Sequence, residues 1–460
     1  MISKSLTDRR DERVRRNSTV GLLLFLGIVF LTGGGSRSDI SSLAILRFVA
    51  ACTLAWAILR VSRLDLARIW LPLLLLAAVA CIAVLQLVPL PPGFWTALPG
   101  REVIARIDVL IGLDSWRPIS LSPVRTANTL ASLILPLTAL LLFANARNSD
   151  TILLGFVFFG LMSGLLGILQ LFADPHSAIY LYKITNSGSA VGLFANRNHH
   201  SVFLACGILI SLYLTRPSPK KLPRWKQWGL AGSIVFMTLA IVANGSRAGL
   251  IALFLVILIT AIAAIFGRSR FVRQSPATSI ARRYLFPAAL GLSGTMVFAL
   301  FAFAGRSTAL SRLLAGGQIE DLREKLLPYL LKMATEFQPL GTGLGAFEYA
   351  YRMREPYELL NPSYLNQAHN DWLQFPIEGG GAAILIMVTG VGLTLLRLFR
   401  LVKSAGGGDQ RIDECWLGFG LIVVLGVASL VDYPLRVPSI MTLAIIALAM
   451  FSRPLPRKDS

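Results

Sequence analysis

Charged residues are scarce in this 460-residue sequence: they make up 15% of the chain, against 55% hydrophobic residues. A soluble globular protein carries about 25% charged residues, so the composition excludes a soluble globular fold of this size. Cysteine is also rare. The four cysteines lie in or beside apolar runs, and no two of them have the spacing of metal ligands. We interpret Cys52, Cys81, Cys206 and Cys415 as small apolar residues that fill gaps.

Acidic residues are fewer than basic ones, 24 against 44, which gives a formal net charge of +20. In a soluble protein such an excess would suggest nucleic acid binding. Here the basic residues lie in short segments between apolar runs, which is the pattern of membrane topology. We therefore expect the lipid bilayer as a partner, and no nucleic acid. No pair of histidines or carboxylates has the spacing of a zinc or hard-cation site, so we expect neither a metal nor a cofactor.

Apolar runs recur along the chain at about the 20-residue length that a membrane-spanning helix needs. They predict twelve spans, near 19–35, 40–59, 69–90, 127–144, 151–172, 198–214, 228–243, 248–266, 284–304, 381–401, 416–431 and 437–451. The first run resembles a secretory signal, but no A-x-A-like cleavage site follows it, so we predict a retained helix. The predicted fold is an all-α polytopic membrane protein that forms a single domain over residues 1–460.

Lys and Arg gather on one side of this topology. With the amino terminus inside, the basic segments "DRRDERVRR", "RVSRLDLAR", "TRPSPKKLPRWKQ", "GRSRFVRQSPATSIARR", "RLFRLVKSAGGGDQR" and "SRPLPRK" all fall inside. The positive-inside rule then places both termini in the cytoplasm. The outer side carries long segments near 91–126, 173–197 and 305–380, tight turns at 244–247 and 432–436, and all four histidines.

The largest outer segment, 305–380, lies between the ninth and tenth predicted spans. Its stretch "IEDLREKLLPYLLKMATEF" has apolar residues at near-helical spacing, interrupted by Pro328, and predicts a helical hairpin or interfacial helices over the outer mouth of the bundle. The glycines of "GTGLG", residues 341–345, do not follow a strand and fit neither the Walker nor the dinucleotide spacing. We therefore interpret them as turns.

Two arginines stand at the entrances of predicted spans. In "VANGSRAGLIAL", Arg247 lies between two apolar runs with almost no loop to hold it in water. A guanidinium there is costly unless it is paired or hydrogen-bonded, so Arg247 either has a function, snorkels to the interface or pairs with a distant acid. In "GLFANRNHHSVFLA", Arg197 lies between Asn196 and Asn198, which either hydrogen-bond sugar hydroxyls or cap the next helix.

One guanidinium group can bind two phosphate oxygens at once, and it stays protonated. Two arginines at the outer surface therefore suit a lipid diphosphate. The adjacent His199 and His200 fit a polar collar at the interface. In "SLVDYPLRVPSI", Asp432 and Arg436 are four residues apart, so Arg436 either pairs with Asp432 or contacts substrate.

The stretch "NQAHNDWLQFPIEGGG" places His369 beside Asn370, Asp371 and Glu378 at the entrance to the tenth span. Pro376 and the triple glycine separate it from that span, which predicts a short helix or re-entrant turn at the membrane face. An imidazole titrates near neutral pH, so His369 is a candidate to take a proton from a sugar hydroxyl.

Together, "LQLVPLPPGFWTALPGRE", "GLFANRNHH", "NGSRAGLIAL", "PLGTGLGAFEYAYR", "NQAHNDWLQFPIEGG" and "DYPLRVPS" resemble the O-antigen ligase and Wzy-type polymerase superfamily over residues 85–450. The resemblance implies a GT-C-type, metal-independent, inverting inner-membrane glycosyltransferase with its core at 127–451. It would take a glycan from undecaprenyl diphosphate at the periplasmic face and pass it to lipid A core, a lipid-linked glycan or protein. The family's essential Arg in the "SR-x-G" turn carries over to Arg247, its second Arg near "NRN" to Arg197, and its large-loop His to His369.

On this hypothesis Arg197 and Arg247 neutralise the leaving diphosphate, while His369 orients or deprotonates the acceptor. The expected substrate-binding residues are Asn196, Asn198, Asn370, Glu378 and Arg436. Two alternatives stay open. A transporter or lipid flippase shares the span count, although the sequence has no internal repeat and no ionisable residue deep in a span. A peptidoglycan-type polymerase would place a catalytic acid in the large outer loop instead of His369.

Overall fold

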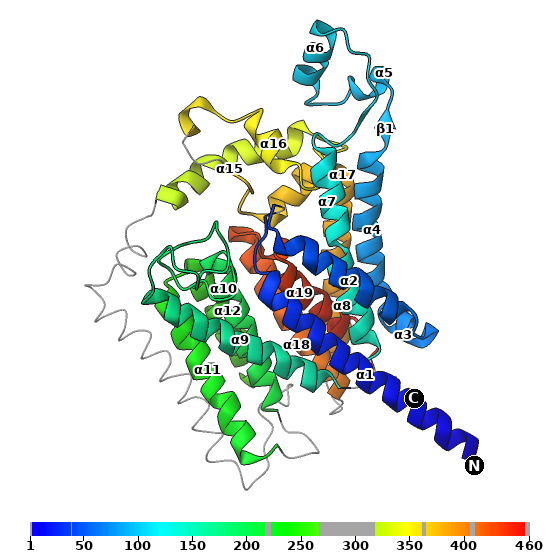
Figure 1. Ribbon diagram of the computed structural model, residues 1–460, viewed down its shortest axis with the longest axis vertical. Helices are drawn as coiled ribbons and strands as arrows, with labels where there is room; N and C mark the ends of the chain where they lie inside the picture. The colour runs from blue at the N-terminus through cyan, green and yellow to red at the C-terminus, as the bar shows by residue number, and fades with distance from the viewer. Residues whose placement is uncertain are drawn as a thin grey trace.

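The computed structural model describes residues 2–37, 39–146, 148–216, 222–265, 318–360, 365–404 and 410–455. Over these ranges the chain is a bundle of helices with a helical cap at one end (Figure 1). The bundle helices are α1 (Ile2–Thr32), α2 (Ser42–Ile58), α3 (Arg63–Arg68), α4 (Trp70–Leu87), α7 (Pro123–Ser132), α8 (Ile134–Ala144), α9 (Ser149–Leu171), α10 (Arg197–Leu214), α11 (Arg224–Asn244), α12 (Arg247–Ile265), α17 (Asp371–Lys403), α18 (Gln410–Val431) and α19 (Pro438–Phe451).

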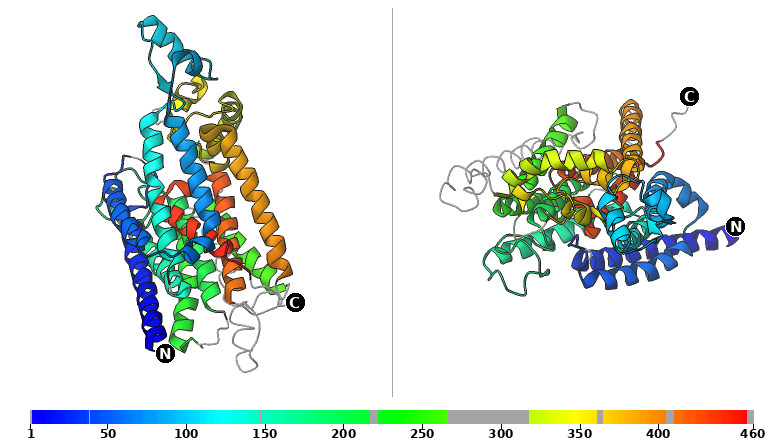
Figure 2. Two further views of the ribbon diagram at one scale, coloured as in Figure 1. Left: turned by 90° about the vertical axis from the view of Figure 1, so that its right-hand side faces the viewer. Right: turned by 90° about the horizontal axis from the view of Figure 1, so that it is seen from above.

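The remaining elements lie mainly at the cap end, and all of them except α15 are short. They are β1 (Pro89–Leu90), α5 (Pro92–Trp95), α6 (Glu102–Leu110), β2 (Arg117–Pro118), α15 (Gln318–Glu336), α16 (Phe347–Arg352) and the 3-10 turns η2 (Tyr357–Leu359) and η3 (Pro434–Arg436). The strands β1 and β2 pair antiparallel. The start of α1 lies at the end of the bundle away from α6 (Figure 2).

The all-α polytopic class predicted from the sequence is confirmed. Within the described ranges, seven helices are long and apolar enough to cross a membrane, and three shorter apolar helices join them, at Ser42–Ile58, Arg247–Ile262 and Pro438–Phe451. Eleven of the predicted spans coincide with helices of the bundle, whereas the ninth, 284–304, lies outside the described residues. The total of twelve stays a prediction.

The fourth predicted span is divided. It forms α7 and α8, which meet at Leu133. Pro136 explains the break, because proline has no N–H for the carbonyl four residues earlier and its ring clashes with that carbonyl. In the cap the opposite correction applies: α15 runs on through Pro328, where we predicted an interruption.

Helix α10 lies at the centre of the bundle, packed against α9, α11, α12 and α18. Every residue of α10 from His199 to Leu214 is buried. The cysteine prediction holds for half of the set, because Cys206 and Cys415 are buried in the core. Cys52 and Cys81 instead lie exposed on outward helix faces.

Helix α17 has a kink where it meets the cap. At Gly380 the backbone has φ 61° and ψ −151°, a conformation open almost only to glycine. A Cβ on Gly380 would lie 2.2 Å from the carbonyl oxygen of Pro339. The bend separates a short helix, 371–379, from the long span that follows, as the sequence predicted.

Residues 341–345, the "GTGLG" segment, lie against this kink. The backbone N–H groups of Thr342 and Gly343 donate to the carbonyls of Ile377 and Glu378, both at 3.0 Å. Gln86 of α4 joins the same contact: its side-chain amide donates to the Glu378 carbonyl at 2.8 Å and accepts from the Leu344 N–H at 2.8 Å. The glycine-rich turn therefore holds the first part of α17 in place through these hydrogen bonds.

Candidate functional site

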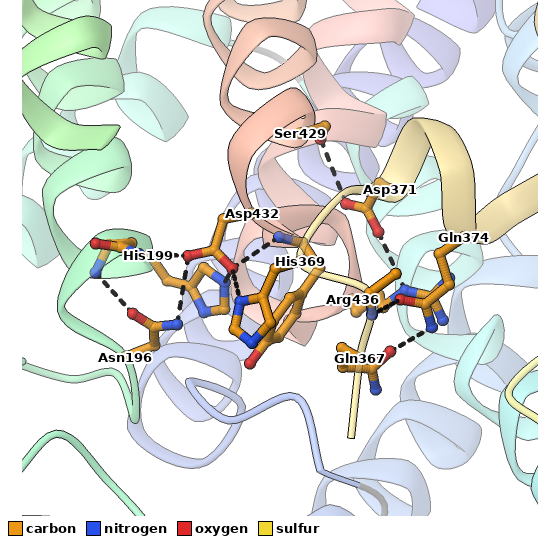
Figure 3. Close-up of polar contacts among 12 residues, drawn as sticks. Asn196, His199, Gln367, His369, Asp371, Gln374, Ser429, Asp432 and Arg436 are labelled. Atoms are coloured by element: carbon orange, nitrogen blue, oxygen red, sulfur yellow. Dashed lines mark hydrogen bonds and ion pairs between the residues drawn. The ribbon is translucent and has the colours of Figure 1, made fainter. Parts of the chain in front are cut away.

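Asp432 joins the polar turns at the cap end of the bundle. It follows α18 directly and is 1% exposed. Its Oδ2 accepts hydrogen bonds from the side-chain amides of Asn198, at 2.6 Å, and Asn196, at 3.4 Å. Its Oδ1 accepts from its neighbour's backbone N–H at 3.0 Å and lies 3.1 Å from Nδ1 of His369. Figure 3 shows Asp432 between His369 and the residues at the start of α10.

The ionisation of Asp432 follows from these neighbours. Burial alone would raise the pKa of its carboxyl group, but His199, whose Nε2 lies 3.8 Å from Oδ1, and His369 outweigh that effect through charge and hydrogen bonding. The pKa of Asp432 is therefore held well below its usual value. An ionised carboxylate accepts hydrogen bonds only, so Nδ1 of His369 must carry the proton in this contact.

His369 lies in the turn before α17, with φ 50°. A positive φ is uncommon for a residue other than glycine and marks a locally strained backbone. Asn370 caps the helix that follows, because its Oδ1 accepts from the Leu373 N–H at 3.1 Å. The ring of Tyr433 packs edge-on against His369, with centroids 4.8 Å apart. Since Nδ1 faces Asp432, the neutral imidazole carries its basic lone pair on Nε2.

The beginnings of α10 and α12 are tied together beside Asp432. Asn198 donates to Asp432 and accepts from the Ser246 hydroxyl, at 2.8 Å. Asn244 donates to the backbone carbonyl of Arg197 at 3.1 Å. The structure therefore brings together three turns that are far apart in the sequence, at 196–198, 244–247 and 432–436.

Arg197 and Arg247 are the first residues of α10 and α12, and both are partly exposed. The N-terminus of a helix carries partial positive charge and unsatisfied N–H groups, so it favours anions. Asn196 acts as a cap, as one of its two interpretations predicted: its Oδ1 accepts from the Asn198 N–H at 2.8 Å. Two helix N-termini, each with an arginine at its first position, therefore lie close to Asp432, the partner of His369.

Arg436 belongs to a second polar cluster on the other side of the same turn. One alternative from the sequence was that Arg436 pairs with Asp432, but it does not. Its Nε lies 3.0 Å from Asp371 and its NH2 group lies 3.0 Å from Glu378. Burial alone would lower the pKa of Arg436, but the charges of these two carboxylates raise it. Glu378 is 1% exposed and also accepts from the Gln374 side-chain amide at 2.9 Å.

Comparison with known families adds one finding. Residues 232–388 match the family described as O-antigen ligase. These residues form an O-antigen ligase domain. No curated protein matches the chain. The domain supports a membrane enzyme of ligase or polymerase type that acts on lipid-linked glycans. The match contains Arg247 and His369, whereas Arg197 and Asp432 lie outside it.

The protein also has a groove beside the Arg436 cluster. It has a volume of about 490 Å³ and lies between α4, α7, α17 and α19. Its outer part is lined by polar groups, including Arg125, Asn366 and Asp371. Its inner part is lined by apolar side chains of the spans, including Leu76 and Ile445. The groove therefore matches an amphipathic molecule that has a polar head and a hydrocarbon tail.

Sequence reasoning missed several members of the site. Asp432 was considered only as a partner of Arg436, and Asp371 received no role of its own. His199 and His200, interpreted as an interfacial collar, are buried instead, at 1% and 0% exposure. Among the described residues, no three His, Cys, Asp or Glu side chains lie together as metal ligands would.

Proposed function

We propose that this protein transfers a glycan from undecaprenyl diphosphate to an acceptor hydroxyl at the periplasmic face of the bacterial inner membrane. The observation that carries the proposal is the contact between His369 and Asp432, next to the N-termini of α10 and α12. A base, its orienting carboxylate and an anion-binding surface are the groups that such a transfer requires.

Asp432 fixes the tautomer and orientation of His369, so that Nε2 receives a proton. The acceptor hydroxyl attacks the anomeric carbon of the donor sugar and passes its proton to Nε2. The bond between that carbon and the diphosphate oxygen breaks, and the electron pair leaves with the lipid diphosphate. One displacement inverts the configuration at the anomeric carbon. The buried carboxylate stabilises the imidazolium that forms.

Arg197 and Arg247 neutralise the departing diphosphate in this scheme. Their helix N-termini add partial positive charge, which gains strength where protein and lipid exclude water. Neither arginine can act as the base, because a guanidinium keeps its proton at neutral pH. The reaction as written needs no metal, because the arginines supply the charge that a cation would otherwise provide.

The groove beside Arg436 is the proposed route for the second lipid-linked substrate, the acceptor. It is separated from Arg197 and Arg247 by the turns that carry His369 and Asp432, so two lipids can approach the base from opposite sides. Its polar outer part suits a glycan, while its apolar inner part suits a lipid chain. In this arrangement Asn370 and Glu378 shape the site through capping and ion pairing.

The test is complementation of a deletion strain, read as the gel profile of surface glycans. The His369→Ala variant should be inserted and abundant, yet fail to restore the profile. His176→Ala is the matched control, since His176 is an exposed histidine that is also predicted on the outer side. Loss of all glycan from lipid A core would identify a ligase, and a single capped repeat would identify a polymerase. A normal profile with His369→Ala would refute the proposed base.

A further inference from the structure

A larger cavity, of about 1610 Å³, lies at the end of the bundle away from His369. The length of helix α10 gives the distance between the candidate site and the cavity. Arg197 begins the helix at the candidate site, and Arg216, just past its other end, lines the cavity. Eighteen residues of α-helix span about 27 Å, close to the hydrocarbon thickness of a bilayer. The cavity therefore faces the opposite leaflet from the candidate site.

Basic side chains outnumber acidic ones in the lining of this cavity. The seven basic residues are Arg15, Arg16, Arg68, Arg216, Lys226, Arg411 and Arg453, against the two acids Asp150 and Glu414. Both acids are already paired. Arg216, 6% exposed, donates to both oxygens of Asp150, at 2.9 and 3.0 Å, and Arg453 pairs with Glu414.

Three of the basic residues hold positive charge that these acids do not neutralise. Arg15 and Arg16 extend from α1, and Lys226 extends from the first turn of α11 on the facing side. Within the described part of the chain, no acidic side chain lies within salt-bridge distance of these three residues. Two different helices therefore present cations to one shared space, which suits an anion bound between them.

The walls of the cavity are apolar and continue onto the membrane-facing surface. Val20 of α1, Phe158 of α9 and Trp225 of α11 line it and are 51%, 56% and 71% exposed. A soluble anion such as free phosphate makes no use of such walls. A phospholipid does, because its headgroup can lie among the basic side chains while its acyl chains follow the exposed apolar residues.

We propose that this cavity is a binding site for an anionic phospholipid of the leaflet opposite the candidate active site. The headgroup phosphate is held by Arg15, Arg16 and Lys226, and the acyl chains lie along α1 and α9. Because the three cations come from α1 and α11, the bound lipid joins the first helix to the rest of the bundle. The site is independent of the glycan transfer proposed above.

The test uses the full chain, purified in detergent and titrated with phosphatidylglycerol or with phosphatidylethanolamine of the same acyl chains. Binding is followed by native mass spectrometry and by the rise in melting temperature. We compare the variant Arg15→Gln/Arg16→Gln/Lys226→Gln with Arg63→Gln/Arg400→Gln/Lys403→Gln. The control removes the same charges from exposed residues outside the cavity. Phosphatidylglycerol with brominated chains adds a local readout, because bromine quenches tryptophan fluorescence near Trp225.

The expected result is saturable binding of phosphatidylglycerol that is at least about tenfold tighter than that of phosphatidylethanolamine. The cavity variant should lose at least about tenfold in affinity relative to the control variant, and Trp225→Phe should remove part of the quenching. Equal losses in the two triple variants would overturn the proposal, because they would indicate general surface charge. So would binding that ignores the headgroup, or competition by inorganic phosphate at concentrations equal to those of the lipid.

Discussion

Replacing Asp432 with Asn keeps the shape of the side chain and removes its charge. Asp432 is 1% exposed, and its oxygens face Asn196, Asn198 and His369. In the variant one oxygen becomes an NH2 group. Asn198 can accommodate it by turning its own amide, since Ser246 can then accept where it now donates. The hydrogen bond to His369 therefore survives as a neutral one.

The size of the rate loss in Asp432→Asn follows from the loss of charge. A hydrogen bond to a charged group contributes about 1.5–3 kcal/mol, against about 0.5–1.5 kcal/mol for a neutral one. The difference of about 1–1.5 kcal/mol corresponds to a rate loss of about tenfold. Removing the base itself costs more, about 100-fold or above, so His369→Ala should be the more severe change. The folded fraction of each variant, measured by melting in detergent, corrects for any loss of stability.

The assay is glycan transfer by purified protein, with Asp432→Asn, His369→Ala and the double variant compared at equal folded concentration. If Asp432 acts through His369, the double variant should be no slower than His369→Ala, within a factor of about three. Multiplied losses, near 1000-fold in the double variant, would refute the reasoning. They would mean that Asp432 assists the reaction without the imidazole.

Further predictions concern stability. The lowered pKa of Asp432 contributes stability above the unfolded-state value of about 3.9 and loses it as pH falls through the folded-state pKa. The melting-temperature gap between wild type and Asp432→Asn should thus shrink below about pH 4; a gap that widens there would contradict the sign. Gly380→Ala, with its Cβ 2.2 Å from a carbonyl oxygen, should destabilise the fold by more than about 2 kcal/mol, whereas Gly390→Ala, in open space, should be neutral or stabilising. Arg436→Gln leaves the buried Glu378 and the partly buried Asp371 without their cation, at a cost of about 3–5 kcal/mol. Adding Glu378→Gln should restore part of that loss in melting experiments.

Much of the helical architecture could be predicted from the sequence, because apolar runs of span length have few other solutions. The short helix before the tenth span could also be predicted, from Pro376 and the glycines around Gly380. We predicted the fourth span as one helix because it was identified by the hydrophobicity of the run. A single proline, Pro136, hardly changes that hydrophobicity. The buried α10 was predicted as an ordinary span, and its burial depends on neighbours that come from distant segments.

The sequence could show which residues are candidates for the site, but not which of them contact one another. His369 stood out as a histidine among polar residues at the entrance to a span. Its contact with Asp432 joins positions 63 residues apart and depends on how α17 packs against α18. The pairing of Arg436 with Glu378 likewise replaced the simpler expectation from i, i+4 spacing. A sequence gives no direct information about such long-range pairs.

We propose that His369, supported by Asp432, acts as the base in transfer from a lipid diphosphate. The most direct measurement is release of undecaprenyl diphosphate by the purified, reconstituted protein, with donor and acceptor supplied in the membrane. Wild type and His176→Ala should release the lipid diphosphate only when the acceptor is present, with an inverted glycosidic bond in the product. His369→Ala should bind the donor as tightly and release about 100-fold less or lower. Release at the wild-type rate by His369→Ala would contradict the account.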